Sequence, residues 1–389
     1  MQKQVKWFLL AALLVPCWVI GIKYEIDLVV LHATAQFLNS DLTRVYAQNG
    51  TLGRYFYGPF SLILIKPLGY LSFPTVKYFW LCLQTLSYFV FWHTLTQLYP
   101  ILNNPKAFWG WLLVWIMAIN PIHNNFQSNN IQLMLATVLV LAESLCQKPS
   151  KKAQIWGGLL VAFTAGIKVF PAFLVVYYFI AKSSSTRKGI IIGCLIVALS
   201  PFVVLGPSKA YFLYQGFIAN LTTYSADNSL TKTNDILCLP SLLARWGFTS
   251  PQSNALVLFL SAIFFVWVFL RKSRPNFSSI EPYLLAFAWT LSVLLNPSTR
   301  PHYFIFYVPA YCILINRLQL KDWSKTAMGC LTLVSALLIA FTAEGIVGKP
   351  LNELLEAASI PTYGMLILCL SLLFAIRNEG SFAKAATNV

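Results

Sequence analysis

The chain has 389 residues, of which 58% are hydrophobic and only 10% charged, and its formal net charge is +16. A soluble domain carries about 25% charged residues, so this composition excludes an ordinary soluble protein. The excess of positive charge does not indicate nucleic-acid binding, because the basic residues form short clusters between apolar blocks, as in the cytoplasmic loops of membrane proteins.

Apolar blocks of about 16–20 residues follow one another along the chain, and only helices of this length can carry such blocks across a bilayer. The segment 57–72 is interrupted by Pro59, Pro67 and Gly69 and is predicted to be interfacial or re-entrant. The predicted fold class is an all-α polytopic membrane protein with interfacial helices on its outer face, forming one domain over 1–389. About twelve spans are predicted, at 6–22, 75–98, 107–122, 130–147, 153–168, 170–182, 187–206, 253–271, 280–296, 302–317, 324–343 and 360–377.

Basic clusters set the predicted orientation. With the N-terminus inside, "KPSKK" (148–152), "RKSRPN" (271–276) and "NRLQLKDWSK" (316–325) all lie in the cytoplasm, as does the C-terminus. We expect a multi-pass protein of the plasma membrane with an extracytoplasmic site, and the sequence predicts no particular oligomeric state. The loops expected on the outer face are 23–74, 123–129, 207–252, 297–301 and 344–359.

The N-terminal apolar stretch lacks a cleavage signal and is interpreted as an uncleaved first span. The eight cysteines include no Cys-Xaa-Xaa-Cys pair, and seven of them lie in apolar blocks, where cysteine acts as a small hydrophobe. The sequence therefore predicts neither a disulfide framework nor a metal site.

Five polar clusters interrupt the apolar blocks, all at predicted outer ends of spans. Polar side chains near a bilayer are costly and usually functional, so five clusters at one level predict a single outward-facing cavity. The clusters are Glu25 with Asp27; Tyr55 to Pro59; Asn120 to Gln132; Lys168; and 296–304, which contains Arg300, His302 and Tyr303.

Each cluster also has a purely structural interpretation. Asp27 could pair with Lys23, Lys168 could extend to the lipid headgroups, and Tyr57 could belong to an interfacial aromatic belt. The remaining candidates could act as caps, turn residues or an interfacial histidine: His123, Asn129, Asn130 and His302.

The residue types suit glycosyl transfer from a lipid phosphate. The chain contains no Gly-rich phosphate loop and no Ser-His-Asp spacing. A carboxylate such as Asp27 can accept the proton of an attacking hydroxyl, and Lys168, Arg300 and His302 can stabilise charge on a departing phosphate. Amide and phenol groups suit sugar hydroxyls, and the candidates of this kind are Tyr57, Asn129, Asn130 and Tyr303. His123 is a further candidate for substrate binding.

Five segments, in chain order, resemble glycosyltransferase family 87 of the GT-C superfamily. They are "DLVVLHATAQFLNSDLTRVY", "YFYGPFSLILIKPLGYLSFP", "NPIHNNFQSNNIQLMLATVLVLA", "AGIKVFPAFLVVYYF" and "NPSTRPHYFIFYVPA". This sequence departs from the family's pattern in two of these segments. Gly-Gln-Xaa-Asn is replaced by Asn129-Asn130-Ile131-Gln132, which keeps two amides but loses the glycine, and a histidine pair is reduced to Pro301-His302.

The resemblance implies an enzyme that transfers mannose or arabinofuranose, and we expect an inverting hexosyltransferase with mannose as the favoured sugar. Members of the family move a sugar from a polyprenyl phosphate to a lipid or polysaccharide acceptor, so the implied partners are membrane lipid, that donor and a glycolipid or glycan acceptor. Asp27 is then the general base, and Lys168 and His302 are cationic residues of the active site. No cofactor is expected.

Three other hypotheses for the function remain open. A lipid or sugar transporter would carry polar residues near the bilayer midplane on paired broken helices. A ligase that joins whole glycans would have a large Arg-rich outer loop, whereas 207–252 contains only Arg245. A non-catalytic assembly subunit would tolerate simultaneous substitution of Asp27, Lys168 and His302.

Overall fold

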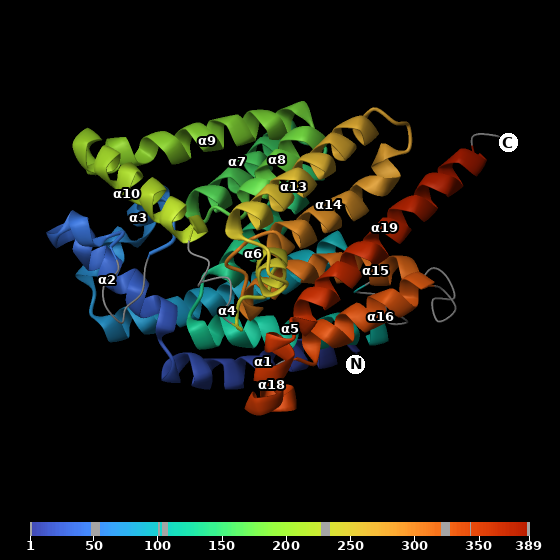
Figure 1. The fold of residues 1–389 in the computed structure, drawn as a ribbon, viewed down its shortest axis with the longest axis horizontal. Coiled ribbons are helices and arrows are strands. Elements are labelled where there is room, and N and C mark those ends of the chain that lie inside the picture. The colour runs from blue at the N-terminus through green and yellow to red at the C-terminus, as the bar shows by residue number, and fades with distance from the viewer. Residues whose placement is uncertain are drawn as a thin grey trace. The chain divides into compact units, whose positions relative to one another are not determined.

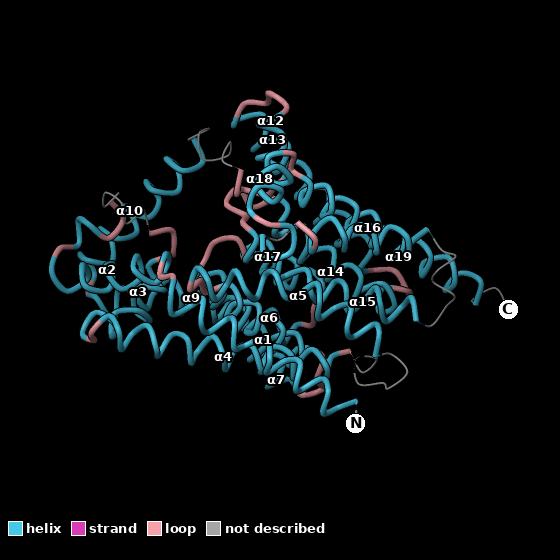
Figure 2. Tube along the Cα trace, turned by 90° about the horizontal axis from the view of Figure 1, so that it is seen from below, coloured by secondary structure: helices cyan, strands magenta, loops and turns pink. Residues whose placement is uncertain are grey.

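A computed structural model describes residues 2–47, 55–99, 102, 108–226, 234–319, 327–342 and 344–386. All regular structure in these residues is helical, as Figure 2 shows, which confirms the predicted all-α class. The helices are α1 (Gln2–Lys23), α2 (Ile26–Ser40), η1 (Leu42–Arg44), α3 (Pro59–Ile65), η3 (Lys66–Tyr70), α4 (Phe73–Leu98), α5 (Phe108–Ser128), α6 (Gln132–Cys146), α7 (Lys151–Ile167), α8 (Ala172–Ala181), α9 (Ser184–Leu205), α10 (Pro207–Ala226), α12 (Leu239–Arg245), α13 (Ser250–Lys272), α14 (Phe277–Leu294), η6 (Pro301–Tyr307), α15 (Val308–Gln319), α16 (Ala327–Ala340), α17 (Glu344–Val347), α18 (Lys349–Ala357) and α19 (Ile360–Ala386).

The chain divides into two compact units. The first unit comprises 6–94 and 123–226, and the second comprises 1–5, 95–122 and 227–389. Because the chain divides in this way, the expectation of one domain over the whole chain stays a prediction.

Several helices have the length and apolar surface that a bilayer requires. Within the described residues, five are long and apolar enough to cross a membrane: Gln4–Lys23, Ser184–Leu205, Ser250–Lys272, Phe277–Leu294 and Ile360–Asn378. On α9, Ile191, Leu195, Leu199 and Val203 form an exposed stripe at four-residue spacing, a surface that water does not favour. These features indicate a membrane protein, and the count of twelve spans stays a prediction.

In the first unit, α7 and α9 approach each other closely through glycine. A Cβ added at Gly158 would lie 2.1 Å from the carbonyl oxygen of Thr186, and one at Gly189 would lie 2.0 Å from that of Ile155. Small residues at such contacts let two helices pack without a hydrophobic driving force from water. Figure 1 shows α7, α8 and α9 side by side in green.

A second part of the same unit packs around α2. Leu28, Leu31, Tyr57, Leu62 and Trp80 are buried in one hydrophobic cluster contributed by α2, α3, α4 and the segment before α3. The segment 57–72 forms only α3, of seven residues, and η3, of five. At about 1.5 Å per residue this is too short to cross a hydrocarbon core of about 30 Å, as expected, and its interfacial position stays a prediction.

In the second unit, buried hydroxyl groups join three helices. The Tyr311 hydroxyl of α15 lies 2.7 Å from Ser335 Oγ of α16, which donates to the backbone carbonyl of Gly364 on α19 at 2.8 Å. Almost every residue of α14 from Tyr283 onward is buried, which places this helix at the core of the unit.

Three predicted outer loops contain helices, and their position on the outer face stays a prediction. The segment 123–129 continues α5 through Ser128, 207–252 contains α10 and α12, and 344–359 contains α17 and α18. Helix α10 begins with Pro207 at its first position, where a missing N–H costs nothing. Residues 48–54 and 227–233, within predicted loops, lie outside the described residues.

Candidate functional site

Asp27 lies in the first turn of α2, partly buried. A carboxylate in this position is favoured by the partial positive charge of the helix N-terminus. The neighbouring acid, Glu25, is engaged elsewhere, in an ion pair with Lys77 of α4. The two acids that the sequence places together therefore have separate partners.

The neutral side-chain amide of Asn130 orients the Asp27 carboxylate. Its Nδ2 donates a hydrogen bond to Asp27 Oδ2. Its Oδ1 accepts from the backbone N–H of Gln132 at 3.1 Å, which fixes the amide so that the nitrogen faces the carboxylate. This contact orients Asp27 without cancelling its charge.

Asn129 fixes the chain just before Asp27. Its Nδ2 donates to the carbonyl oxygens of Gly21 at 3.0 Å and Tyr24 at 2.7 Å, at the end of α1. Its own carbonyl accepts from Trp80 Nε1 at 2.9 Å. Asn129 has φ 50°, a left-handed conformation that asparagine tolerates better than most residues. The residue is fully buried and joins α1, α4 and the turn before α6.

Lys168 follows α7 directly and lies over an aromatic ring. Its Nζ is 5.0 Å from the centre of the Tyr57 ring, within cation–π range. The Gly58 N–H donates to the Ile167 carbonyl at 3.1 Å, which joins the two segments. Because a Cβ at Gly58 would lie 2.6 Å from the carbonyl oxygen of Gly166, this approach requires glycine.

The segment that carries Tyr57 is held by hydrogen bonds from several directions. The Tyr46 hydroxyl donates to the Tyr57 carbonyl at 3.1 Å, and Asn220 Nδ2 of α10 donates to the Tyr55 carbonyl at 2.8 Å. The Tyr55 hydroxyl lies 2.6 Å from Ser61 Oγ. Burial raises the pKa of both Tyr46 and Tyr55, so the two hydroxyls stay protonated at neutral pH.

One hydrophobic cluster underlies these polar groups. Leu28, next to Asp27, and Tyr57 belong to the cluster, and Ile131 and Ile167, next to Asn130 and Lys168, pack against it. The structure therefore gathers five of the predicted site residues in one region of the first unit: Asp27, Tyr57, Asn129, Asn130 and Lys168. His123, also of this unit, is half-buried on α5 rather than in the expected loop.

Three predicted site residues belong to the second unit. Arg300 is about half exposed, with its Nε 3.2 Å from Asp235 Oδ2. His302 is buried in η6, with its ring 5.0 Å from that of Tyr303. These residues form a group of their own at the end of α14, so a cavity shared with Asp27 stays a prediction.

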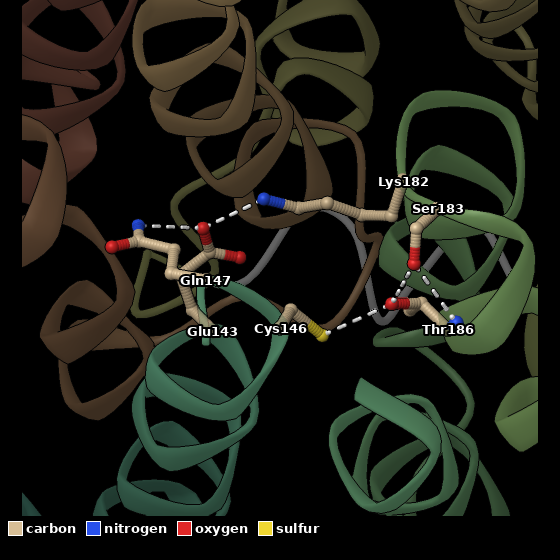
Figure 3. A network of polar contacts seen from close by, with 6 residues as sticks. All are labelled: Glu143, Cys146, Gln147, Lys182, Ser183 and Thr186. Carbon is tan, nitrogen blue, oxygen red and sulfur yellow. Dashed lines mark hydrogen bonds and ion pairs between the residues drawn. The ribbon is translucent and has the colours of Figure 1, made fainter. Parts of the chain in front are cut away.

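Two further asparagines support the fold of the first unit. Asn125, a member of the predicted polar cluster from Asn120 to Gln132, accepts from the Leu133 N–H in the first turn of α6 at 2.9 Å. Asn220, which the sequence did not single out, donates to the Tyr55 carbonyl. The sequence did not predict a buried ion pair in which Glu143 Oε1 lies 2.7 Å from Lys182 Nζ (Figure 3). The signal for the pair was a glutamate inside an apolar block, "LVLAESLC".

The described residues contain no group of three or more His, Cys, Asp or Glu side chains that could hold a metal ion. Cys238, the one cysteine outside the predicted apolar blocks, is buried at the start of α12, where its Sγ accepts from the Ser241 N–H.

The comparisons with known proteins identify the family. The model of glycosyltransferase family 87 matches residues 55–298, more than half of the chain. No curated protein and no solved structure matches the chain. The matched residues include Tyr57, Asn130 and Lys168, whereas Asp27 and His302 lie outside them. The chain belongs to glycosyltransferase family 87 and is therefore a glycosyltransferase.

Proposed function

We propose that the chain is an inverting hexosyltransferase, with mannose the favoured sugar, that uses a polyprenyl-phosphate donor and a lipid or glycan acceptor. Family membership supports the transferase class. The observation that carries the finer assignment is the Asp27 carboxylate, oriented by the Asn130 amide at the start of α2. This arrangement suits a base that must keep its capacity to accept a proton.

In the proposed reaction, an acceptor hydroxyl gives its proton to Asp27 and its oxygen attacks C1 of the sugar. The bond between C1 and the phosphate oxygen breaks, and the electron pair leaves with the polyprenyl phosphate. Asp27 then releases the proton to water. Because the leaving group is a stable anion, the step needs no nucleotide, and we propose that it needs no metal.

Cationic side chains support the departure of the phosphate. The ammonium of Lys168, steadied over the Tyr57 ring, suits contact with developing negative charge. In the second unit, Arg300, His302 and Tyr303 have the charge and hydrogen-bonding groups to bind the donor. Two further residues complete the proposed set. His123 binds the substrate, and Asn129 holds the chain before Asp27.

We further propose about twelve spans, cytoplasmic termini and an extracytoplasmic site in the plasma membrane. The positions of the basic clusters support this orientation. A donor confined to the bilayer would reach such a site by lateral diffusion, which supplies part of the proximity that the reaction needs.

The test uses purified protein in lipid nanodiscs with radiolabelled polyprenyl-phosphate hexoses and a lipid extract as acceptor. We expect label to move from one donor to a product with inverted anomeric configuration, with unchanged rate in excess EDTA. Retention of configuration or no consumption of any donor contradicts the proposal, and loss of activity with EDTA contradicts its metal-free part.

A further inference from the structure

The first unit contains a groove that the proposed reaction does not yet use. Its volume is about 350 Å³, and it lies between the η1 region and α10. Leu42, Thr43 and Tyr46 line one side, and Phe212, Asn220 and Thr223 line the other. All six residues belong to the first unit.

The polar groups that line the groove are neutral and rich in acceptor atoms. The Thr43 hydroxyl donates to Asp41 at 2.6 Å, and the Thr223 hydroxyl donates to the Ala219 carbonyl at 2.9 Å. The Tyr46 hydroxyl and Asn220 Nδ2 donate to backbone carbonyls as well. Each of these groups already donates one hydrogen to the protein, so the hydroxyl oxygens and the Asn220 amide oxygen have lone pairs for a ligand that donates hydrogen bonds.

The apolar part of the lining includes two aromatic rings, those of Tyr46 and Phe212. Phe212 is 44% exposed, and the ring of Tyr46 lies 5.8 Å from that of Phe217, which supports it from α10. Flat aromatic rings beside hydroxyl and amide oxygens suit a sugar, whose ring has apolar C–H faces and hydroxyl groups around its edge. Among the described residues that line the groove, none is a lysine or arginine, so these side chains offer no charge partner to a phosphate.

The groove is connected to the proposed reaction site by two hydrogen bonds. Tyr46 and Asn220, which line it, are the residues that hold the Tyr55 and Tyr57 carbonyls. The Tyr57 ring in turn lies under the Lys168 ammonium. A ligand in the groove would therefore contact the two side chains that hold the segment carrying Tyr57, whose ring lies under the Lys168 ammonium.

We propose that this groove binds the neutral carbohydrate part of the acceptor, whereas the anionic donor binds elsewhere. The proposal rests on the proposed function. A volume of about 350 Å³ lies at the small end of ligand sites, which suits a sugar headgroup rather than a polyprenyl chain. The groove would then determine which acceptor sugar is used.

The chain offers a matched pair of positions for the test. Thr222 and Thr223 are neighbours on α10, both exposed, and both hydroxyls donate to the Ala219 carbonyl at 2.9 Å. Only Thr223 lines the groove. Thr223→Trp fills the groove, Thr222→Trp adds the same bulk outside it, and Ala219→Leu fills the groove from a second position.

Binding is measured first, with short butyl glycosides of several hexoses and pentoses, by calorimetry on protein in nanodiscs. We expect at least one glycoside to bind, and its affinity to fall at least about tenfold in Thr223→Trp and Ala219→Leu but not in Thr222→Trp. Because the ligand is neutral, the affinity should not depend on salt. Equal losses in both tryptophan variants, no binding of any glycoside, or displacement by butyl phosphate overturns the proposal.

Kinetics separate this proposal from the proposed function. With any acceptor that the wild type uses, Thr223→Trp should raise KM for the acceptor and leave KM for the donor unchanged. A wild type that consumes no donor contradicts the proposed function alone, since glycoside binding is judged without it. Donor consumption with an unchanged acceptor KM in Thr223→Trp contradicts the groove alone.

Discussion

Asp27 and Glu143 are acidic residues of the same unit that accept hydrogen bonds from different kinds of side chain. Asp27 begins α2 and receives a hydrogen bond from the neutral Asn130 amide. Glu143 is buried on α6, where its Oε1 lies 2.7 Å from the Lys182 ammonium and accepts from Gln147 Nε2 at 2.9 Å (Figure 3).

The difference distinguishes an acid that stabilises the fold from an acid that takes part in the proposed reaction. A carboxylate bound by a buried ammonium is electrostatically satisfied, and its loss leaves the partner's charge stranded in a low-dielectric interior. A carboxylate oriented by an amide keeps its charge available for a proton. We therefore expect substitutions at Glu143 to change stability and substitutions around Asp27 to change turnover.

Glu143→Gln should have the largest effect on stability. It leaves Lys182 buried without its carboxylate, which costs about 3–5 kcal/mol when one partner of a buried pair is removed. Thermal unfolding in nanodiscs measures the change, with activity per folded molecule unchanged. Glu25→Gln is the control, because Glu25 is 37% exposed and its pair with Lys77 should contribute below about 1 kcal/mol.

A double variant tests the same pair from the other side. Glu143→Leu combined with Lys182→Met removes both charges and should recover most of the stability lost in the single variants. If the double variant is as unstable as the sum of its parts, the two charges do not act as a pair.

Lys168→Met should have the next largest effect, on turnover. Removing a donor that stabilises charge in the transition state typically lowers kcat by about 10²- to 10³-fold. Lys168→Arg keeps the charge and the cation–π contact with Tyr57 and should retain more activity. Steady-state kinetics measure both, and equal losses in the two variants would assign the effect to packing rather than charge.

Asn129 and Asn130 should behave differently although they are neighbours. Asn130→Ala releases Asp27 and should lower kcat about tenfold, or about 1.4 kcal/mol, with little change in KM or melting temperature. Asn129→Ala leaves the Gly21 and Tyr24 carbonyls without their donor and should lower the melting temperature. A stable Asn129→Ala or a fully active Asn130→Ala contradicts these roles.

The smallest expected effect concerns Glu356 of α18, an acid of the second unit. Burial raises the pKa of its carboxyl from 4.5 to about 7, with smaller contributions from neighbouring groups. The folded state then binds more protons between these values, so stability should fall as the pH rises from about 4.5 to about 7. Hydrogen exchange of α18 at pH 5.5 and pH 8 measures this, and Glu356→Gln should remove the pH dependence.

Apolar blocks made much of the helical fold predictable. The predicted span 75–98 became α4 (Phe73–Leu98), and 187–206 became α9 (Ser184–Leu205), because long apolar runs leave the backbone no other way to satisfy its hydrogen bonds in lipid. Helix α10 was missed because Gln215, Asn220 and Thr222 interrupt its apolar pattern. The Thr222 hydroxyl donates a hydrogen bond to the Ile218 carbonyl of the same helix at 3.1 Å.

Residue types indicated candidate site members, but not their partners. Asp27 and Asn130 were both predicted from sequence, yet their hydrogen bond joins residues far apart in the chain. Glu143 and Lys182 come from the end of α6 and the residue after α8, and only the packing of α6, α7 and α8 brings them together. Such pairings depend on tertiary structure, which no local pattern encodes.

The most direct test of the contrast between the two acids compares Asp27→Asn with Glu143→Gln. The transfer rate per folded molecule is measured for both variants in nanodiscs at saturating donor. The account predicts a fall of about 10²- to 10⁴-fold for Asp27→Asn at an unchanged melting temperature, because general-base catalysis is lost. It predicts near wild-type turnover for the folded fraction of Glu143→Gln. Undiminished transfer by Asp27→Asn would contradict the assignment of Asp27 as the base.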